Sequence, residues 1–417
     1  MGGDGATTSS EERARSESGA RGSVREVLWV FTKLGLTSFG GPVAHLGYMK
    51  AELVDRRKWV CDRTYADLVA LCQFLPGPAS SQVGMSLGLR RAGLLGGLAA
   101  WIGFTLPSAL LLTLFALGIV QFGGDRSSWL HGLEVVAVPV VALAIWGMAR
   151  SLCPDAPRAT IAVAAAIAAI AWRSPFSQIG ILLVAAACGF ALYRGATSEV
   201  SPSEPREPTR IRVWQGALSL VVFFALLAGL PAASAATHLP GLDVFERFYR
   251  VGSLVFGGGH VVLPLLEHEV VAPGWTTSER FLAGYGAAQA IPGPLFSFSA
   301  YLGFILDTTP TRWAGAALAL IAIFLPSYLM VVGALPFWAR LRGSRMAQAG
   351  LRGTNAGVVG LLVAAFYDPV WTVGVRSGTD FALGAAALVA LAQWKLPPWL
   401  VVIATALASA GLHAAMR

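Results

Sequence analysis

The sequence predicts an all-α, polytopic membrane protein made of two inverted-topology repeats with broken helices. Three observations carry this prediction. Only 13% of the residues are charged and 55% are hydrophobic, whereas about a quarter of the residues in a soluble domain are charged. Apolar stretches of about 20 residues, the length that spans a bilayer, recur along the chain. The two halves also carry the same motifs in the same order, which is typical of secondary transporters.

The repeat is visible in two aligned motifs. Residues 31–42 read Phe-Thr-Lys-Leu-Gly-Leu-Thr-Ser-Phe-Gly-Gly-Pro, and residues 248–259 read Phe-Tyr-Arg-Val-Gly-Ser-Leu-Val-Phe-Gly-Gly-Gly. A Gln-x-x-Pro-Gly-Pro motif follows each copy, at 73–78 and at 289–294. Further matches in the same register pair Trp59 with Trp275, Leu106-Pro107-Ser108 with Leu325-Pro326-Ser327, and Gly132 with Gly350. Chance does not explain so many collinear matches, so the pattern indicates a duplication.

Hydropathy divides the chain into about 10–13 membrane segments. The first repeat, residues 27–193, has predicted segments at 27–48, 66–89, 94–120, 130–149, 158–172 and 176–193. Residues 194–245 hold a polar linker and then a connecting transmembrane helix at 213–236. The second repeat, residues 246–417, has predicted segments at 246–271, 280–306, 313–338, 352–370, 379–394 and 397–415. Residues 1–26 are rich in Ser, Gly, Arg and Glu, and we expect them to form a disordered cytoplasmic tail.

Counting the segments predicts how the repeats are oriented. Each repeat has an even number of segments and one helix joins the repeats, so the two repeats face opposite ways in the membrane. Cytoplasmic loops of membrane proteins are enriched in Lys and Arg. With a cytoplasmic N-terminus, about 18 cations fall inside and about 12 outside, and the cationic stretch at residues 50–63 is the main exception. We therefore expect a multi-pass protein of the inner cell membrane with a cytoplasmic N-terminus.

The duplicated Pro-Gly-Pro motifs predict interrupted helices. A proline inside a helix removes a backbone donor and clashes with the preceding turn, so two prolines around a glycine should end the helix. Gly77 can then act as the N-cap of a new helix that starts at Pro78. The free amides of residues 79–81, and of residues 295–297 in the second repeat, would point into the break. Helix N-termini attract anions, so the two Pro-Gly-Pro breaks and the two Gly-Gly breaks are expected to converge on an anion site.

The candidate substrate-binding residues belong to these breaks or are polar side chains near them. They are Lys33, Gly40, Gly41, Gln73, Pro76, Gly77, Pro78, Ser80, Ser81, Arg250, Gly257, Gly258, Gly259, Gln289, Pro292, Gly293, Pro294 and Ser297. Gln73 and Gln289 either donate to an oxyanion or bond the carbonyls that the prolines leave free. Lys33 and Arg250 occupy equivalent positions, and an ionisable residue in a membrane segment indicates function. The alternative for both cations is snorkelling to the interface.

Other patterns limit the class of function. His45 and His260 follow the Gly-Gly motifs and are either proton relays or hydrogen-bonded structural residues, of which the second is favoured. The sequence holds no zinc-protease, nucleophile-elbow or P-loop motif, and its four cysteines form no metal-type or redox-type pair. We therefore expect no enzyme activity, no cofactor and no metal. The net charge of +8 comes mostly from loop cations that orient helices, so no nucleic-acid partner is expected.

The motifs resemble those of the chromate transporter (CHR) family. Residues 31–42 and the first Gln-x-x-Pro-Gly-Pro are similar to its first domain. The segments similar to its second domain are Phe256-Gly257-Gly258-Gly259, Pro264-Leu265-Leu266, Gly274-Trp275 and the second Gln-x-x-Pro-Gly-Pro. The resemblance covers nearly all of the chain after residue 26 and implies the two-domain form, whose members export chromate, confer chromate resistance and show competition with sulfate. Two departures from symmetry are Pro42 opposite Gly259 and Lys33 opposite Arg250.

The expected function is therefore a secondary transporter that exports an oxyanion, chromate by resemblance, through alternating access. Three alternatives remain at this point. They are a transporter of sulfate or another tetrahedral oxyanion, an anion channel, and an integral membrane enzyme that acts on a phosphorylated lipid. The expected partners are the chromate or sulfate-like oxyanion and membrane lipid, with a homodimer left open.

Overall fold

The computed structural model describes residues 22–122, 128–172, 177–195, 211–256, 259–338 and 344–415, and within these ranges it contains helices and no strand. The first repeat comprises α2 (Val24–Thr37), α3 (Gly41–Met49), the π-helical turn η1 (Lys50–Arg56), α4 (Asp62–Phe74), α5 (Ala79–Phe122), α6 (Ser128–Leu152), α7 (Ala156–Ala171) and α8 (Ser177–Tyr193). Helix α9 (Val213–Thr237) connects the two repeats. Helix α2 begins inside the tail expected at 1–26, and residues 1–21 lie outside the described part.

The second repeat has a similar order of helices, with more short helical turns between them. It comprises α10 (Pro240–Leu254), η3 (Gly259–Val261), α11 (Val262–Val270), α12 (Ser278–Ala290), η4 (Leu295–Ser297), α13 (Phe298–Ile305), α14 (Arg312–Ala334), η5 (Leu335–Phe337), α16 (Arg345–Ala365), η6 (Phe366–Trp371), α17 (Thr372–Gly374), α18 (Gly378–Ala392) and α19 (Pro398–Ala415).

Five helices in the described ranges are long and apolar enough to cross a membrane: 79–121, 129–152, 213–237, 312–337 and 345–374. Each of the four segments that contain a predicted break is divided into shorter helices. Residues 27–48 form α2 and α3, residues 66–89 include the end of α4 and the start of α5, and the equivalent segments of the second repeat form α10 with α11 and α12 with α13. The all-helical membrane fold predicted from hydropathy is therefore confirmed.

Helix α5 is a hairpin of two helices. Its backbone leaves the helical region at Ala92 (φ −137°) and at Gly93 (φ +68°). A Cβ atom added to Gly88 would lie only 2.8 Å from the Cβ of Ala100, which places the two limbs side by side. The positive φ of Gly93 is a conformation that other residues rarely adopt, so the glycine permits this tight reversal. The second limb of α5 corresponds to α14 in the second repeat.

The two repeats use the same helix crossing near the aligned Lys-Leu-Gly and Arg-Val-Gly motifs. Helix α2 packs on α5, and α10 packs on α14. A Cβ atom added to Gly35 would meet the carbonyl oxygen of Phe104 at 2.7 Å, and one added to Gly252 would overlap the carbonyl oxygen of Ile323. Small residues at such crossings let the backbones of membrane helices approach closely. The repeated glycine therefore has a packing role that is the same in both halves.

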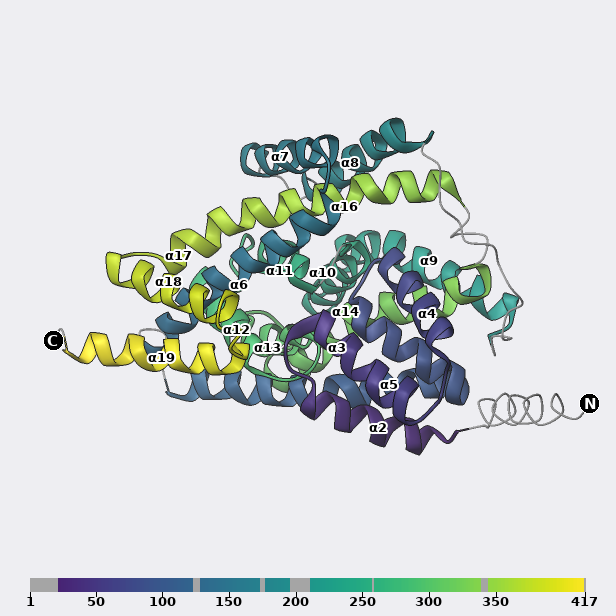
Figure 1. The fold of residues 1–417 in the computed structure, drawn as a ribbon, viewed down its shortest axis with the longest axis horizontal. Coiled ribbons are helices and arrows are strands. Elements are labelled where there is room, and N and C mark those ends of the chain that lie inside the picture. The colour runs from purple at the N-terminus through teal and green to yellow at the C-terminus, as the bar shows by residue number, and fades with distance from the viewer. Residues whose placement is uncertain are drawn as a thin grey trace, which may run out of the picture.

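The repeats interlock through their last helices. Helix α16 packs against α7 and α8 of the first repeat, whereas α6 packs against α18 and α19 of the second. Figure 1 shows α7 and α8 above α16 at the top of the view, with α18 and α19 next to α6 on the left. Each repeat thus covers the long helix of the other, and neither repeat packs as a separate body.

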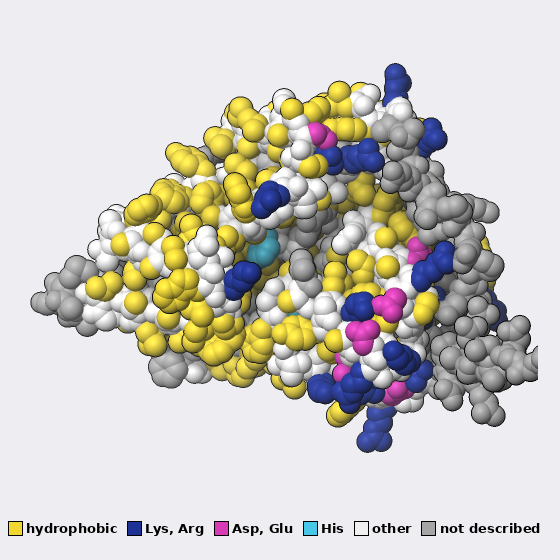
Figure 2. All heavy atoms as spheres, viewed as in Figure 1, with side chains coloured by type: hydrophobic (Ala, Val, Ile, Leu, Met, Phe, Trp, Pro, Cys, Tyr) yellow, Lys and Arg dark blue, Asp and Glu magenta, His cyan; other side chains and the backbone are white. Residues whose placement is uncertain are grey.

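The surface separates apolar from charged regions. Helix α9 exposes a row of large apolar side chains: Val213, Trp214, Leu218, Val221 and Phe224. Figure 2 shows apolar side chains over the left and upper parts of one face, and charged side chains mainly towards the right. Exposed apolar surface on this scale is typical of helices that contact lipid.

Candidate functional site at the paired helix breaks

The first Pro-Gly-Pro ends one helix and starts another. Helix α4 ends at Phe74 and α5 begins at Ala79, with Gly77 at φ +119° between them. The carbonyl of Pro78 accepts the first hydrogen bond of α5, from the amide of Gln82 at 3.0 Å. Pro78 is therefore the N-cap, one residue later than predicted. The amides of residues 79–81 have no partner within the helix, because the first turn of a helix leaves its donors unpaired.

The second Pro-Gly-Pro interrupts its segment in a different way. Helix α12 ends at Ala290, Gly293 has φ +103°, and a 3₁₀ turn (η4) precedes α13. The amide of Ser297 donates to the carbonyl of Pro294 at 3.0 Å. The expectation that residues 295–297 all offer free amides is therefore wrong for Ser297. A 3₁₀ turn closes its first hydrogen bond one residue earlier than an α-helix does, and only the amides of residues 295 and 296 lack a helical partner.

The Gly-Gly motifs also start helices. Gly40 (φ +96°) and Gly41 (φ +77°) reverse the chain after α2, and α3 begins at Gly41 with Pro42 in its first turn. In the second repeat, η3 begins at Gly259 and leads into α11. The candidate residues Gly257 and Gly258 lie outside the described residues.

Two reciprocal hydrogen bonds bring the four breaks together. The amide of Gly77 donates to the carbonyl of Val255 at 2.6 Å, and the amide of Gly293 donates to the carbonyl of Ser38 at 3.0 Å. Ser38 and Val255 occupy equivalent positions, each just before a Gly-Gly motif. Each Pro-Gly-Pro therefore binds the Gly-Gly break of the opposite repeat, as a two-fold relation between the repeats requires.

Serines of the repeated Leu-Pro-Ser motif contact the same breaks. A Cβ atom added to Gly77 would overlap the Oγ of Ser327, and one added to Gly293 would lie 2.8 Å from the Oγ of Ser108. The Oγ atoms of Ser108 and Ser297 are 2.6 Å apart and share a hydrogen bond. The sequence comparison aligned the two Leu-Pro-Ser motifs without assigning them to the site. Their repetition at matched positions was the signal that could have done so.

Several polar atoms around the breaks are buried and lack a hydrogen-bond partner in the described part of the chain. They include the Oγ atoms of Ser38, Ser81 and Ser327, the Oε1 of Gln82 and the Nε2 of Gln289. Leaving a buried polar group unpaired costs about 1–3 kcal/mol. Since several such atoms gather near one set of broken helices, this region is equipped to bind a polar ligand or water. The remaining serines are partnered: Ser80 lies 3.5 Å from Nδ1 of His45, and Ser299 donates to the carbonyl of Phe296.

The two motif glutamines have different environments. Gln73 is exposed on α4, whereas Gln289 is half-buried and its amide nitrogen is one of the unpartnered atoms. Gln82 instead bonds a carbonyl within the break, because its Nε2 donates to the carbonyl of Pro76 at 2.5 Å. Gln82 has no glutamine at the matching position of the second repeat, so the comparison of the repeats did not reveal its role.

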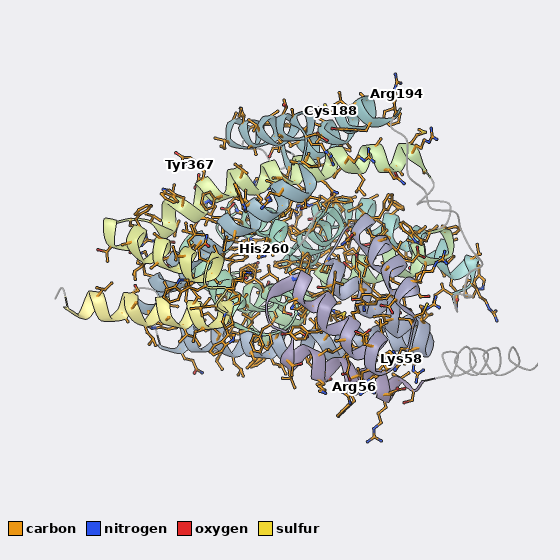
Figure 3. The ribbon with its side chains drawn as sticks, in the orientation of Figure 1. Arg56, Lys58, Cys188, Arg194, His260 and Tyr367 are labelled. Atoms are coloured by element: carbon orange, nitrogen blue, oxygen red, sulfur yellow. The ribbon has the colours of Figure 1, made fainter. Side chains whose placement is uncertain are left out.

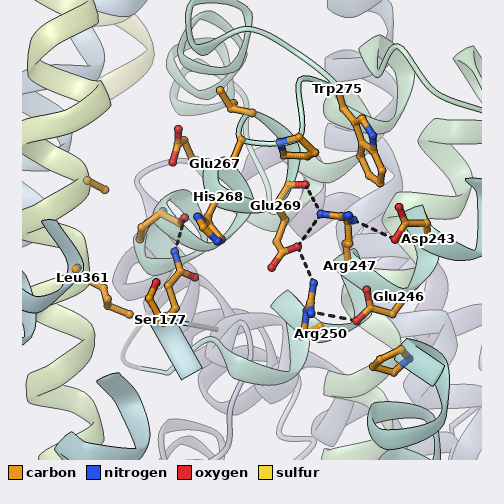
Figure 4. Close-up of a pocket in the computed structure, with 18 of the residues that line it drawn as sticks. Ser177, Asp243, Glu246, Arg247, Arg250, Glu267, His268, Glu269, Trp275 and Leu361 are labelled. Atoms are coloured by element: carbon orange, nitrogen blue, oxygen red, sulfur yellow. Dashed lines mark hydrogen bonds and ion pairs between the residues drawn. The ribbon is translucent and has the colours of Figure 1, made fainter. Parts of the chain in front are cut away.

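The two aligned cations also differ. Lys33 is exposed on α2. Arg250 lies in a cluster of ionic groups, with Nη2 2.7 Å from Glu269 and Nε 3.3 Å from Glu246. Arg247 bridges Asp243 at 3.1 Å and Glu269 at 3.3 Å. Figure 4 shows both guanidinium groups directed at the carboxylate of Glu269.

This ionic cluster lines a cavity of about 1160 Å³, to which α7, α8, α9, α10, α11 and the end of α16 contribute. Arg250 is the candidate residue that this cavity shares with the predicted site. The cluster carries three carboxylates and two guanidinium groups, so an anion in the cavity meets cations that are already paired. Glu269 is a largely buried partner of two arginines.

The two histidines near the Gly-Gly motifs are hydrogen-bonded. Nδ1 of His260 lies 2.7 Å from the hydroxyl of Tyr285, and His45 has the contact with Ser80 described above. Figure 2 shows a hollow in the middle of one face with a histidine on its wall, and Figure 3 labels His260 at this place in the same orientation. The preferred interpretation of both residues as hydrogen-bonded histidines agrees with these contacts.

Comparison with known proteins gives the relationship of the chain. The family model described as chromate transporter matches residues 25–191 and 242–410, one match on each repeat. A chromate transport protein from Pseudomonas aeruginosa is 30% identical over 402 residues, 91% of this chain and 90% of the relative. A probable chromate transport protein from Synechococcus elongatus is 27% identical over 403 residues, 93% of this chain and 95% of the relative.

A chromate transport protein from Cupriavidus metallidurans is 27% identical over 379 residues, 89% of this chain and 87% of the relative. No solved structure matches the chain. These relatives align along most of their length, and they are named as transport proteins. Together with the apolar helices and the two matched segments, this similarity shows that the chain is a multi-pass membrane protein of the chromate transporter family.

Proposed function

We propose that the protein is a secondary transporter that exports a divalent tetrahedral oxyanion, with chromate as the substrate. The observation that supports this proposal most is the meeting of the two Pro-Gly-Pro breaks with the Gly-Gly breaks of the opposite repeats. The bonds from Gly77 to Val255 and from Gly293 to Ser38 hold these breaks together. Discontinuous helices that meet at the interface of two repeats are where secondary transporters bind their substrates.

The donors near the breaks fit an oxyanion. The amides of residues 79–81 start a helix, whose N-terminus carries about half a positive charge. The hydroxyls of Ser38, Ser81 and Ser327 and the amide nitrogen of Gln289 are buried without a partner in the described structure. A hydrogen bond to a charged group contributes about 1.5–3 kcal/mol. A tetrahedral dianion has four oxygens that can accept from several of these donors, so its binding satisfies groups that are otherwise unpaired.

The two aligned cations have separate roles in this proposal. Lys33, which is exposed on α2, attracts the dianion from the side of the first repeat; Glu52, the carboxylate whose charge acts on Lys33, forms its ion pairs with Arg56 and Arg57. Arg250 lies on the side of the second repeat, where Glu269 is 2.7 Å from its guanidinium group. Glu269 therefore competes with the dianion for Arg250 and favours release of the dianion. The unequal pairing of the two cations gives the transport a preferred order of binding and release.

Alternating access between the two sides of this shared centre is part of the proposal. The proposed inverted orientation places the two Gly-Gly breaks on opposite sides of the shared centre. The backbone contact across the centre consists of two amide–carbonyl bonds, each worth about 0.5–1.5 kcal/mol, so opening the centre itself breaks few backbone hydrogen bonds. The cavity beside Arg250 is the proposed route on one side. The protein would lie in the inner membrane with a cytoplasmic N-terminus.

The membrane potential can drive export of a dianion. One elementary charge that crosses 100 mV changes its energy by about 2.3 kcal/mol, so a dianion that leaves a negative interior gains about 4.6 kcal/mol. At about 1.4 kcal/mol per factor of ten, this energy sustains a gradient of more than about a thousandfold. Uptake of the same dianion would require coupled cations. Export is therefore the direction that the energetics favour.

The names of the relatives point to chromate, and sulfate has the same charge and shape. Chromate uptake into everted membrane vesicles, measured with sulfate and molybdate as competitors, separates the two assignments. A sulfate transporter would be inhibited by sulfate at far lower concentrations than by unlabelled chromate. A channel would show flux that does not saturate and that cannot be driven uphill.

The two glutamines test the location of the site. We expect Gln289→Ala to raise the half-saturating chromate concentration in everted vesicles by about 10-fold or more, because one charge-assisted hydrogen bond is lost. The matched variant Gln73→Ala changes an exposed residue at the equivalent position and should have a much smaller effect. Protein level in the membrane is measured in parallel. Equal effects of the two variants, or normal transport by Gln289→Ala, would place the substrate elsewhere.

A further inference from the structure

A histidine flanked by two buried carboxylates lies away from the helix breaks, where α6 of the first repeat meets the second repeat. His131 is near the start of α6, with Nδ1 2.8 Å from Glu134 and Nε2 3.0 Å from Asp380. Only 7% of the Glu134 side chain and 5% of the Asp380 side chain are exposed. In Figure 1, α6, α12, α18 and α19 lie towards the left of the molecule, and α6 packs on each of the other three.

The hydrogen-bond geometry of this group requires an additional proton, because a neutral histidine and two ionised carboxylates together hold one proton too few. A neutral imidazole has one N–H donor and one acceptor nitrogen, whereas an ionised carboxylate only accepts. Both ring nitrogens of His131 face carboxylate oxygens at hydrogen-bond distance, so both contacts are satisfied only when an additional proton is present on the ring or on one carboxyl group. Without that proton, one nitrogen lone pair faces a carboxylate lone pair.

The charged groups around His131 favour the protonated state of this site, because carboxylates outnumber the other cation. Glu134, which lies on the same helix as His131, faces the imidazole ring. From the chain before α18, the guanidinium of Arg376 lies 3.2 Å from Glu134, and its backbone amide donates to Asp380 at 3.1 Å. From α12, Glu279 lies 3.7 Å from Arg376 and is half exposed. With His131 protonated, Glu134, Asp380, Glu279 and Arg376 leave one net negative charge in this group, and loss of the proton raises it to two.

We infer that His131, Glu134 and Asp380 form a proton-binding site that couples proton binding to the transport cycle. The site joins the two repeats, because α6 belongs to the first repeat and Asp380 to the second. Removal of the proton weakens this junction through lone-pair repulsion and the unbalanced charge. The inference rests on the proposed transport function and adds a coupled ion to it.

Close packing connects this site to the second Pro-Gly-Pro. A Cβ atom added to Gly286 of α12 would overlap the carbonyl oxygen of Leu133, the residue next to Glu134. Gly286 lies one helical turn before Gln289, whose unpartnered amide belongs to the proposed substrate site. Movement of α6 against the second repeat therefore displaces α12 and the break that follows it. Backbone-to-backbone contact transmits such a displacement directly, because no flexible side chain lies between the helices.

The equivalent junction between the repeats is the one where α16 of the second repeat packs on α7 and α8 of the first. Its charged contact uses an arginine where the first junction has the histidine and its carboxylates. Arg352 of α16 aligns with Glu134, and its guanidinium lies over the ring of Tyr193 at 5.6 Å. Arg158 covers the same ring at 5.6 Å and is paired with Asp155. This second junction is built from permanently charged arginines and does not titrate near neutral pH. The cation–π contact of Arg352 with Tyr193 supplies a control for the loss of a charged side chain between the repeats.

The test uses the full-length protein in proteoliposomes with the membrane potential clamped and a pH-sensitive dye enclosed. Chromate flux and chromate-driven proton flux are measured between about pH 5 and pH 9, on both sides of the ordinary histidine pKa of about 6.5. We expect the wild type to show both a pH-dependent rate and coupled proton movement. His131→Gln should abolish the proton movement and flatten the pH profile. Arg352→Gln should keep both, even if its rate is reduced.

Several results would overturn the inference. Chromate flux in the wild type with no proton movement and the same rate across this pH range excludes a coupled proton. An unchanged pH profile in His131→Gln excludes this histidine as the site. If His131→Gln does not insert, Asp380→Asn removes one of the two flanking carboxylates and should shift the profile of the inserted protein; an unshifted profile rejects the site. Absence of chromate flux at every pH would instead refute the proposed transport function.

Discussion

Removal of the Ser327 hydroxyl provides the sharpest prediction, because it should leave the stability of the fold unchanged or higher while it weakens the binding of the substrate. Ser327 is fully buried, its Oγ has no hydrogen-bond partner in the described residues, and it lies directly against Gly77 of the first Pro-Gly-Pro. An unpaired buried hydroxyl costs about 1–3 kcal/mol, so its removal does not weaken the fold. We therefore expect Ser327→Ala to keep the free energy of unfolding unchanged or to raise it by about 1 kcal/mol.

Transport should change in the other direction. If Ser327 donates to the bound dianion, its loss removes a charge-assisted hydrogen bond of about 1.5–3 kcal/mol. At about 1.4 kcal/mol per factor of ten, the half-saturating chromate concentration should rise by about 10- to 100-fold. Saturation curves in everted vesicles measure this change, and thermal unfolding of the purified protein in detergent measures stability.

A second serine provides the control. Ser299 is equally buried, but its Oγ donates to the carbonyl of Phe296 at 2.8 Å. Ser299→Ala should therefore lower stability by about 0.5–1.5 kcal/mol and leave the half-saturating concentration unchanged. If Ser327→Ala lost stability while its transport stayed normal, the hydroxyl would have a structural partner and our interpretation of the buried polar atoms would be refuted.

Three further predictions concern other parts of the molecule. Gly77→Ala should abolish transport and lower the free energy of unfolding by about 1–3 kcal/mol, because φ +119° strains any residue that has a side chain. Gly47→Ala is the control, since a Cβ atom at Gly47 meets nothing within 4 Å. Equal activity of the two variants would contradict the strain argument. Glu269→Gln should lower both the half-saturating concentration and the maximal rate, because Arg250 then holds the anion longer; a faster maximal rate would contradict the competition. The Arg158 guanidinium holds the pKa of Asp155, the N-cap of α7, well below its usual range. A carboxyl group with a depressed pKa contributes its full stabilisation above the unfolded-state pKa and loses it as the pH falls towards the folded-state pKa. The destabilisation by Asp155→Ala at pH 7, about 1 kcal/mol, should therefore shrink below about pH 4 in thermal unfolding. A constant difference at all pH values would show that ionisation of Asp155 is irrelevant.

Local patterns predicted the helices and the positions of the breaks well. Hydropathy identified the connecting helix α9, because about 20 consecutive apolar residues can span a bilayer wherever they lie in the chain. The two Pro-Gly-Pro motifs were predicted to end helices, since the missing amide of proline acts within one turn, and α4 ends at Phe74 and α12 at Ala290. The type of turn after the second motif was not predicted, because the α and 3₁₀ alternatives differ by little energy and packing around Phe296 and Ser297 selects between them.

The alignment of the repeats did not predict that equivalent residues have different partners. Lys33 and Arg250 align, yet Arg250 is enclosed by carboxylates and Lys33 is exposed. Gln73 and Gln289 align, yet one is exposed and the other half-buried. The neighbours of each residue come from other elements, including helices of the opposite repeat, and these neighbours differ between the two halves.

The sequence by itself determined that this protein is a duplicated chain of apolar helices, interrupted at matched positions by glycine and proline. Composition and backbone chemistry are local properties, and they act on each residue regardless of distant partners. Only the tertiary structure decided that Gly77 bonds to Val255, that Gly293 bonds to Ser38, and that Ser327 lies at the break of the opposite repeat. These contacts join residues that are far apart in the chain. Because the residues are buried, their polar groups can bond only to groups that the packing of the two repeats places beside them.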